Sequence, residues 1–121
     1  MSKILLVEDE ISISRLYSIK LTAANYECKV AGNGLEALKS LDEFIPDLVL
    51  LDLGMPVMNG EQFLSIFRKN TNHSETPVLI LTNLNKSEAP KTLWHFGISG
   101  YVVKVHTTPA ELIELIQKTI G

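Results

Sequence analysis

The sequence lacks the usual features of secreted, membrane and nucleic-acid-binding proteins. It has a single cysteine, Cys28, so no disulfide can form within the chain, which fits a reducing compartment. No apolar run approaches the roughly 18 residues of a membrane-spanning helix, and the start MSKILLVEDE turns acidic too early for a signal peptide. The net charge of −3 gives no basic surface for nucleic acid or anionic membranes. We therefore expect a soluble, cytoplasmic protein that binds neither nucleic acid directly nor membranes.

The length and the apolar runs indicate one domain built on a sheet. A chain of 121 residues that is 45% hydrophobic suffices for one core, so we expect residues 1–121 to form a single domain. Most of the apolar runs are continuous rather than alternating, which is typical of strands covered on both faces. The second run is more polar, so we expect it nearer an edge. The runs are Ile4 to Val7, Cys28 to Ala31, Leu48 to Leu51, Val78 to Leu81 and Tyr101 to Val103.

Helical spacing of apolar residues appears between and after these runs. The last helix is the clearest, because Thr108-Pro109-Ala110-Glu111 is a capping box with proline at the first helical position. Segment 84–97 carries Pro90, so a short or mobile helix is expected there. Strands that alternate with helices five times predict an α/β fold, (βα)5, with a doubly wound parallel five-stranded sheet. The expected stripes are Ile13, Leu16, Tyr17, Leu21 and Ala24; Leu35, Leu38 and Leu41; Phe63, Leu64 and Phe67; and Leu112, Ile113, Ile116 and Ile120.

Polar residues follow four of the five predicted strands. Glu8-Asp9-Glu10 follow the first, Asp52 the third, Thr82-Asn83 end the fourth and Lys104 follows the fifth. In open α/β sheets, sites form beyond the carboxyl ends of the strands. Clustered carboxylates repel unless a cation relieves them, and Mg²⁺ binds through few carboxylates while it keeps several waters. The pattern predicts that Asp52 accepts a phosphoryl group, with Mg²⁺ and Lys104 neutralising its oxygens and Thr82 donating a hydrogen bond.

Each of these residues by itself has an ordinary explanation. Acids after a strand can sit at a helix N-terminus, where the helix dipole favours them. Asp52 can start a turn, and threonine suits strands. Their joint placement at one edge of the sheet favours a site.

Four segments match a known family in order: ILLVEDE, LVLLDLGMPVMNG, LILT and GYVVK. Over essentially its whole length the chain resembles the receiver domain of two-component response regulators. The resemblance implies the strand order 2-1-3-4-5. It also implies that Asp52 is the phosphoacceptor, that Glu8, Asp9, Asp52 and the backbone carbonyl of Gly54 hold Mg²⁺, and that Lys104 binds a phosphoryl oxygen.

The resemblance further implies a switch and a set of partners. Thr82 is expected to bond the phosphoryl group, and Tyr101 to swing inward when Thr82 moves, while Pro56 and Gly60 shape the loop after Asp52. The phosphoryl group would come from a phosphohistidine on a sensor histidine kinase or a phosphotransfer protein. A downstream effector, or a second copy of the chain, would bind the face made by the fourth helix, fifth strand and fifth helix. The domain would be a signalling module rather than an enzyme, although it assists its own phosphorylation and dephosphorylation.

Two departures from the family leave an alternative open. Val105 stands where the family usually has a proline that commonly follows a cis peptide. A cis Lys104–Val105 bond would cost about 3 kcal/mol, so either that cost is tolerated or the loop takes another route. Asn83 stands where a small residue is usual, and it could narrow access to Asp52 or bond the phosphoryl group. The alternative function is a degenerate receiver that binds proteins independently of phosphorylation.

Two other functions fit the sequence less well. A haloacid-dehalogenase-like hydrolase needs a second acid two residues after its nucleophile, and that position here is Gly54. A flavin-nucleotide binder needs a Gly/Ser/Thr-rich phosphate loop after the first strand, where this chain has Glu8-Asp9-Glu10. Three carboxylates there would repel a phosphate that has no accompanying cation.

Overall fold

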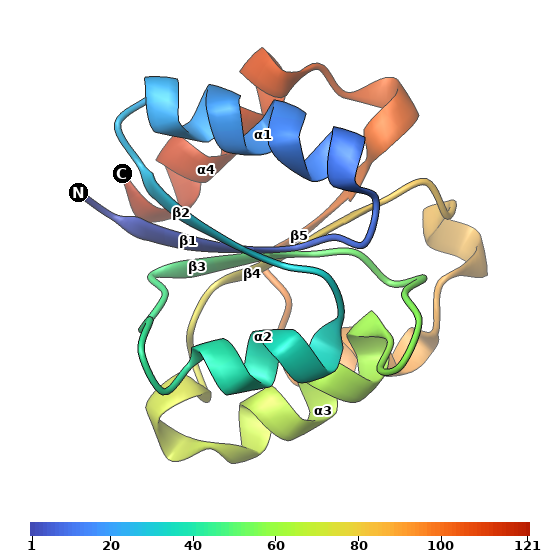
Figure 1. The fold of residues 1–121 in the computed structure, drawn as a ribbon. Coiled ribbons are helices and arrows are strands. Elements are labelled where there is room, and N and C mark those ends of the chain that lie inside the picture. The colour runs from blue at the N-terminus through green and yellow to red at the C-terminus, as the bar shows by residue number, and fades with distance from the viewer.

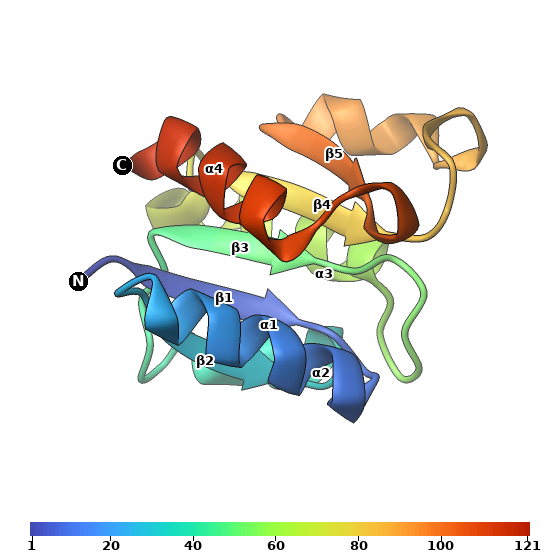
Figure 2. The ribbon, with the colours of Figure 1, turned by 90° about the horizontal axis from the view of Figure 1, so that it is seen from above.

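The computed structural model describes residues 1–121 and contains one five-stranded parallel sheet (Figures 1 and 2). The spatial order is β2-β1-β3-β4-β5, as the resemblance implied, and the more polar β2 lies at an edge, as its sequence predicted. Every neighbouring pair of strands is parallel. The strands are β1 (Lys3–Val7), β2 (Glu27–Ala31), β3 (Leu48–Leu51), β4 (Val78–Thr82) and β5 (Gly100–Val103).

Alternate residues of the strands feed two separate hydrophobic clusters. Leu5 and Val7 of β1 pack into one cluster, and Ile4 and Leu6 pack into the other. Successive side chains of a strand point to opposite faces, so a continuous apolar run fills both layers. Helices α1 (Ile11–Ala23) and α4 (Pro109–Ile120) cover one face of the sheet, and α2 (Gly34–Ser40) and α3 (Gly60–Lys69) cover the other (Figure 1).

The ends of the helices follow from local sequence. The capping box expected at Thr108 is present: its side chain accepts from the Glu111 amide, and Glu111 accepts from the Thr108 amide. A second capping box, Asn59 with Gln62, starts α3 directly after the loop that follows β3. Each box satisfies backbone donors that the first helical turn leaves free.

Two predicted apolar stripes were partly wrong. Leu16 is 47% exposed, because the buried stripe of α1 runs through Ser14, Tyr17 and Leu21 and Leu16 lies on its flank. Leu35 is also exposed, since Ala37 supplies the buried contact of α2. The stripes of α3 and α4 face the core as expected, with Phe63, Leu64 and Phe67 buried on α3, and Leu112 and Ile116 buried on α4.

The connection between β4 and β5 forms two 3₁₀ turns, Lys86–Glu88 and Lys91–Phe96, in place of an α-helix. Side-chain bonds tie it to α3 at two points. Thr92 donates to Glu61 at one end, and Arg68 donates to the carbonyl oxygens of Phe96 and Gly97 at the other. The short helix expected in segment 84–97 is therefore present as 3₁₀ helix rather than α-helix, and hydrogen bonds attach it to α3. No helix in the structure has the length and apolar content needed to cross a bilayer.

Candidate functional site

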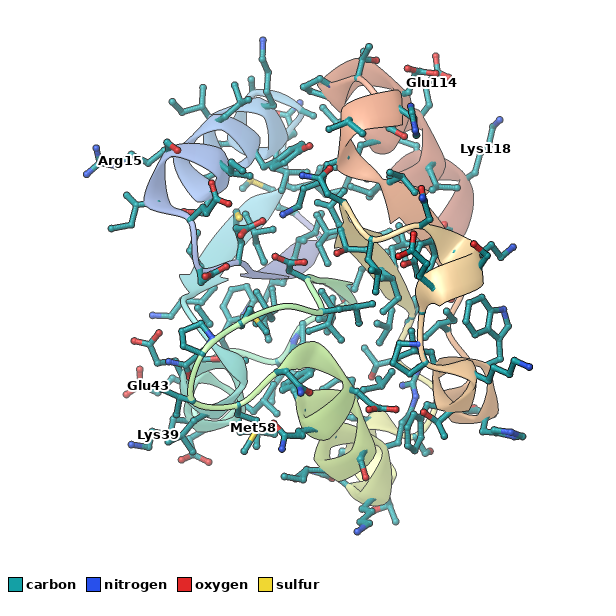
Figure 3. All side chains as sticks on the ribbon, turned by 90° about the vertical axis from the view of Figure 1, so that its right-hand side faces the viewer. Arg15, Lys39, Glu43, Met58, Glu114 and Lys118 are labelled. Carbon is teal, nitrogen blue, oxygen red and sulfur yellow. The ribbon has the colours of Figure 1, made fainter.

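The sheet brings the predicted site residues together at the carboxyl ends of its strands, the end that Figure 3 faces. The backbone hydrogen bonds of the sheet continue one residue beyond β1 and β3. The Glu8 amide donates to the Ala31 carbonyl oxygen at 2.9 Å, and the Asp52 amide donates to the Val7 carbonyl oxygen at 3.0 Å. These two bonds fix the backbones of Glu8 and Asp52 on adjacent strands. Both side chains are buried, with only 3% of Glu8 and 8% of Asp52 exposed.

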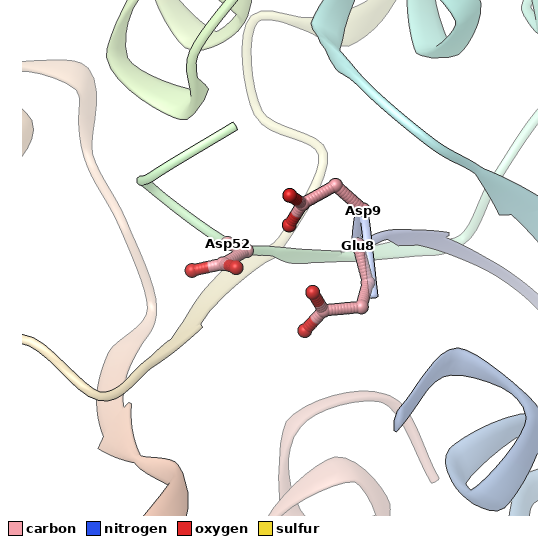
Figure 4. Close-up of side chains that lie close together, drawn as sticks. All are labelled: Glu8, Asp9 and Asp52. Carbon is pink, nitrogen blue, oxygen red and sulfur yellow. The ribbon is translucent and has the colours of Figure 1, made fainter. Parts of the chain in front are cut away.

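Three carboxylates converge at this end (Figure 4). One oxygen each from Glu8, Asp9 and Asp52 lies within 4.8 Å of the others, while Asp9 itself is exposed at the rim. Like charges at this separation favour a bound cation. Three carboxylate oxygens, one of them from Asp52 at the wall of a pocket, suit Mg²⁺, which takes oxygen ligands and keeps several waters. The donor set therefore fits the predicted metal.

Lys104 neutralises part of this negative charge. Its Nζ donates to Glu8 Oε1, and it lies 3.3 Å from Asp52 Oδ2. The other oxygen of Glu8 accepts from the Glu10 amide at 3.1 Å, and Asp52 Oδ1 accepts from the Leu53 amide at 2.8 Å. The direct Lys104–Glu8 pair was not expected from the sequence, which suggested only that Lys104 would lie near the acids.

Burial and this ion pair shift the proton affinities in the site. Burial raises the pKa of Glu8, and this outweighs the lowering by its hydrogen bonds from Lys104 and the Glu10 amide. Burial alone would lower the pKa of Lys104, but the hydrogen bond to Glu8 and the charge of Asp52 prevail and raise it. Lys104 is therefore a permanent cation beside Asp52 at neutral pH.

A pocket of about 270 Å³ opens beside Asp52. Its lining includes Gly54, Thr82 and Lys104 together with Asp52, so four residues predicted for the site share one cavity. Thr82 is 4% exposed, and its Oγ1 accepts from the Leu84 amide at 3.3 Å. A hydroxyl, an ammonium and a carboxylate around one small polar cavity are groups suited to bind a phosphoryl group.

Tyr101 lies on the neighbouring strand β5, where it pairs with Ile80, two residues before Thr82. Its hydroxyl donates to the Leu84 carbonyl oxygen at 2.7 Å, and its ring stacks on Trp94. Burial, with smaller contributions from the charges of Glu88 and Asp52, raises the pKa of Tyr101, so the hydroxyl keeps its proton and remains a donor.

Comparison with known proteins identifies the chain. A model of the response regulator receiver domain family matches residues 4–117. The chain belongs to this family. It is a receiver domain, and 37% of its residues over 118 positions are identical to probable transcriptional regulator ycf27 of Pyropia yezoensis, a match that spans 98% of the chain and 47% of that protein. The CpxR homolog of Haemophilus influenzae is 45% identical over 82 residues, 68% of the chain and 34% of that protein. The chain spans about half the length of the first of these relatives, and less of the second.

Solved receiver structures share the fold. Chemotaxis protein CheY4 of Vibrio cholerae superimposes with a TM-score of 0.90 at 34% identity, and the match covers 98% of both chains. Response regulator TrrA of Thermotoga maritima, solved in complex with Mg²⁺-BeF, gives a TM-score of 0.85 at 33% identity, again over 98% of both chains.

The two departures of this receiver domain from its family meet in one contact. The Val105 amide donates to Asn83 Oδ1 at 3.1 Å, and the Lys104–Val105 peptide is trans. A proline at position 105 would have no N–H to donate. The loop thus takes the second of the two routes left open by the sequence, and the carbonyl of the Asn83 side chain bonds Val105. The bond joins the residue after Thr82 to the residue after Lys104.

The loop after Asp52 depends on a close backbone approach at Gly60. A Cβ on Gly60 would lie 2.2 Å from the Asp52 carbonyl oxygen and 3.0 Å from Leu53 Cα. The Gly60 amide donates to Leu53 at 3.0 Å, which closes the loop onto the end of β3. Val57 in this loop has a positive φ of 67°, a conformation that is rare for a β-branched residue.

Proposed function

We propose that this receiver domain accepts a phosphoryl group on Asp52 from a phosphohistidine of a sensor histidine kinase or phosphotransfer protein, in the cytoplasm. The observation that carries the proposal is the pairing of buried Asp52 with Lys104 at 3.3 Å beside a polar pocket that Thr82 also lines. The carboxylate of Asp52 can accept the phosphoryl group. The ammonium of Lys104 and the hydroxyl of Thr82 lie where they can bind the negatively charged phosphoryl oxygens.

The transfer requires little beyond positioning. An oxygen of Asp52 forms a bond to phosphorus while the phosphorus–nitrogen bond of the donor breaks, and the electron pair of that bond stays on the imidazole. The ammonium of Lys104 lies close enough to Asp52 to neutralise a phosphoryl oxygen on the same carboxylate. The hydroxyl of Thr82 accepts from the Leu84 amide, so its own proton is free to donate to another phosphoryl oxygen.

Glu8, Asp9 and Asp52 would hold Mg²⁺, with the Gly54 carbonyl as a further ligand at the pocket wall. When bound, the metal supplies positive charge against the phosphoryl oxygens. Glu8 also bonds Lys104, so it holds that ammonium and contributes to the metal site from the same buried carboxylate. Hydrolysis of the aspartyl phosphate at the same site would return the domain to its starting state.

The charge change at Asp52 is read by the segment after Thr82. Thr82 and Tyr101 bind the amide and the carbonyl of the same residue, Leu84. A phosphoryl group that accepts from the Thr82 hydroxyl is therefore connected through Leu84 to Tyr101, and this connection shifts the population of the segment. The face formed by segment 84–97, β5 and α4 is where we expect an effector or a second copy of the chain to bind.

A protein donor has to contact the rim of the pocket to reach Asp52. Glu10 lines the pocket, and Ile11, the first residue of α1, is 67% exposed directly after it. An exposed isoleucine beside the entrance suits an apolar contact with the donor protein. A small phosphodonor needs no such contact.

The test is the intact mass of the protein after incubation with Mg²⁺ and acetyl phosphate, quenched in acid. We expect one added phosphoryl group in the wild type and none in Asp52→Asn, whose side chain has the same shape. Omitting Mg²⁺ should also abolish the adduct. Failure of the wild type to form an adduct or to bind beryllofluoride contradicts the proposal and favours a domain that binds partners without phosphate.

A further inference from the structure

The ring of Trp94 contacts Tyr101 of β5 and Lys86 of the segment that follows β4. Its ring stacks on Tyr101, with centroids 5.9 Å apart and planes 16° from parallel, and Lys86 Nζ lies 5.8 Å from the centre of the indole. The side chain is 43% exposed and belongs to neither hydrophobic cluster. The large indole is therefore held by Tyr101 and Lys86, and the core does not depend on it.

Tyr101 connects this exposed ring to the pocket. Its hydroxyl donates to the Leu84 carbonyl oxygen at 2.7 Å, and the Leu84 amide donates to Thr82 Oγ1 at 3.3 Å. Thr82 lines the pocket beside Asp52. A continuous series of contacts thus runs from the pocket through Thr82, Leu84 and Tyr101 to Trp94 at the surface.

We propose that Trp94 is a positioning residue for the phosphoryl site, because its stack on Tyr101 keeps the Tyr101 hydroxyl on the Leu84 carbonyl and so holds the Thr82–Leu84 segment in place. The inference rests on the proposed function, since it assumes that Thr82 binds the phosphoryl group. A parallel ring on one side of Tyr101 restricts the rotations that would take its hydroxyl away from Leu84. Without the stack, ordering this segment becomes an added cost of binding the ligand.

The chain carries its own probe, because Trp94 is its only tryptophan. Mg²⁺ with beryllofluoride, a mimic of the phosphoryl group, should change the Trp94 emission, because a hydrogen bond from Thr82 to the ligand is connected to Trp94 through Leu84 and Tyr101. Mg²⁺ alone should leave the emission unchanged, since the carboxylates that would hold it make no hydrogen bond to Thr82, Leu84 or Tyr101. Tyr101→Phe keeps a ring under Trp94 but removes the hydrogen bond to Leu84, so beryllofluoride should bind about as weakly as it does to Trp94→Ala, and the emission should no longer respond.

Two substitutions of Trp94 separate positioning from a general structural role. Trp94→Ala removes the stack and should weaken beryllofluoride binding by about two- to tenfold, the range expected for loss of one aromatic pair. Trp94→Phe keeps a ring on Tyr101 and should bind within about twofold of the wild type. Mg²⁺ affinity without beryllofluoride, followed by NMR shifts of the amides after β1 and β3, should be the same in all three proteins. A general loss of structure would weaken the binding of both Mg²⁺ and beryllofluoride.

Binding itself is followed independently, by the ¹⁹F NMR signal of protein-bound beryllofluoride. Two results would show that the positioning role is wrong while the proposed function stands. One is a bound ¹⁹F signal without any change in Trp94 emission, and the other is a Trp94→Ala variant that binds beryllofluoride as tightly as the wild type. If the wild type gives no bound signal and no phosphoryl adduct, the proposed function fails, and the role of Trp94 fails with it.

Discussion

The bond between Asn83 and Val105 provides the sharpest test of how this receiver domain tolerates the loss of a proline. The Val105 amide donates to Asn83 Oδ1 at 3.1 Å, across the gap between the ends of β4 and β5. Asn83→Ala removes the acceptor, and Val105→Pro removes the donor. Val105→Pro alone also disturbs Lys104, because the residue before a proline is disfavoured in helical conformations and Lys104 begins a 3₁₀ turn.

A double-mutant cycle isolates the bond from these side effects. A net hydrogen bond contributes about 0.5–1.5 kcal/mol, and this one is exposed, so we expect a coupling free energy of about 0.5–1 kcal/mol. The free energies of unfolding of the wild type, both single variants and the double variant come from urea titrations in Mg²⁺-free buffer. The double variant should be more stable than the sum of the two single losses predicts.

The matched control pairs Val105→Pro with Asn85→Ala. Asn85 is also an asparagine of this loop, but its side chain bonds Glu88 at 3.0 Å and has no contact with Val105. Its coupling to Val105 should be zero within error. A coupling between Asn83 and Val105 no larger than this control would refute the argument that Asn83 compensates for the missing proline.

Three further predictions concern the loop, the core and the donor. Gly60→Ala forces a Cβ to within 2.2 Å of the Asp52 carbonyl oxygen and should lower the free energy of unfolding by about 1–3 kcal/mol or more in urea titrations. Gly54→Ala has open space around its Cβ and should leave the free energy of unfolding almost unchanged. Burial and the charge of Arg68 lower the pKa of His73, so the folded state binds fewer protons than the unfolded state. Stability should therefore fall as pH drops below about 6.5, by at most about 1.4 kcal/mol per pH unit until the folded pKa is reached. His73→Phe should flatten that slope in urea titrations at several pH values, and a slope equal to the wild type's would contradict the assignment. Ile11→Lys should slow phosphorylation by a phosphohistidine protein but not by acetyl phosphate, in rates measured by intact mass; equal slowing with both donors would show that Ile11 acts on the pocket.

Local sequence was enough to predict most of the fold. The five apolar runs became the five strands within one residue at each end. The runs of β1, β3 and β4 are the clearest, because strands covered on both faces have no polar positions that interrupt the apolar pattern. The capping box at Thr108 located the start of α4, since its hydrogen bonds form within four residues. The placement of Glu8, Asp52, Thr82 and Lys104 at one sheet edge also followed from the sequence, because parallel strands put all their carboxyl ends on the same side.

The segment between β4 and β5 and the stripe of α1 were less predictable. Pro90 weakened the helical pattern, and the contacts that tie this segment to α3 come from Arg68 and Glu61, which bond residues well separated from them in sequence. Leu16 fits a helical period as well as Tyr17 does. Which flank of α1 is buried is decided by how the helix docks on the sheet, and periodicity alone does not fix that rotation.

The sequence by itself determined which chemical groups lie at the carboxyl ends of the strands. The apolar runs show where each strand ends, and parallel strands place all of these ends on the same side of the sheet. The tertiary structure decided how those groups pair. Lys104 bonds Glu8 across 96 positions of sequence, and Asn83 meets Val105 across 22. A change of about one ångström in the donor–acceptor distance decides whether a hydrogen bond or ion pair forms. These distances are set by the packing of the sheet and its loops rather than by any local sequence pattern.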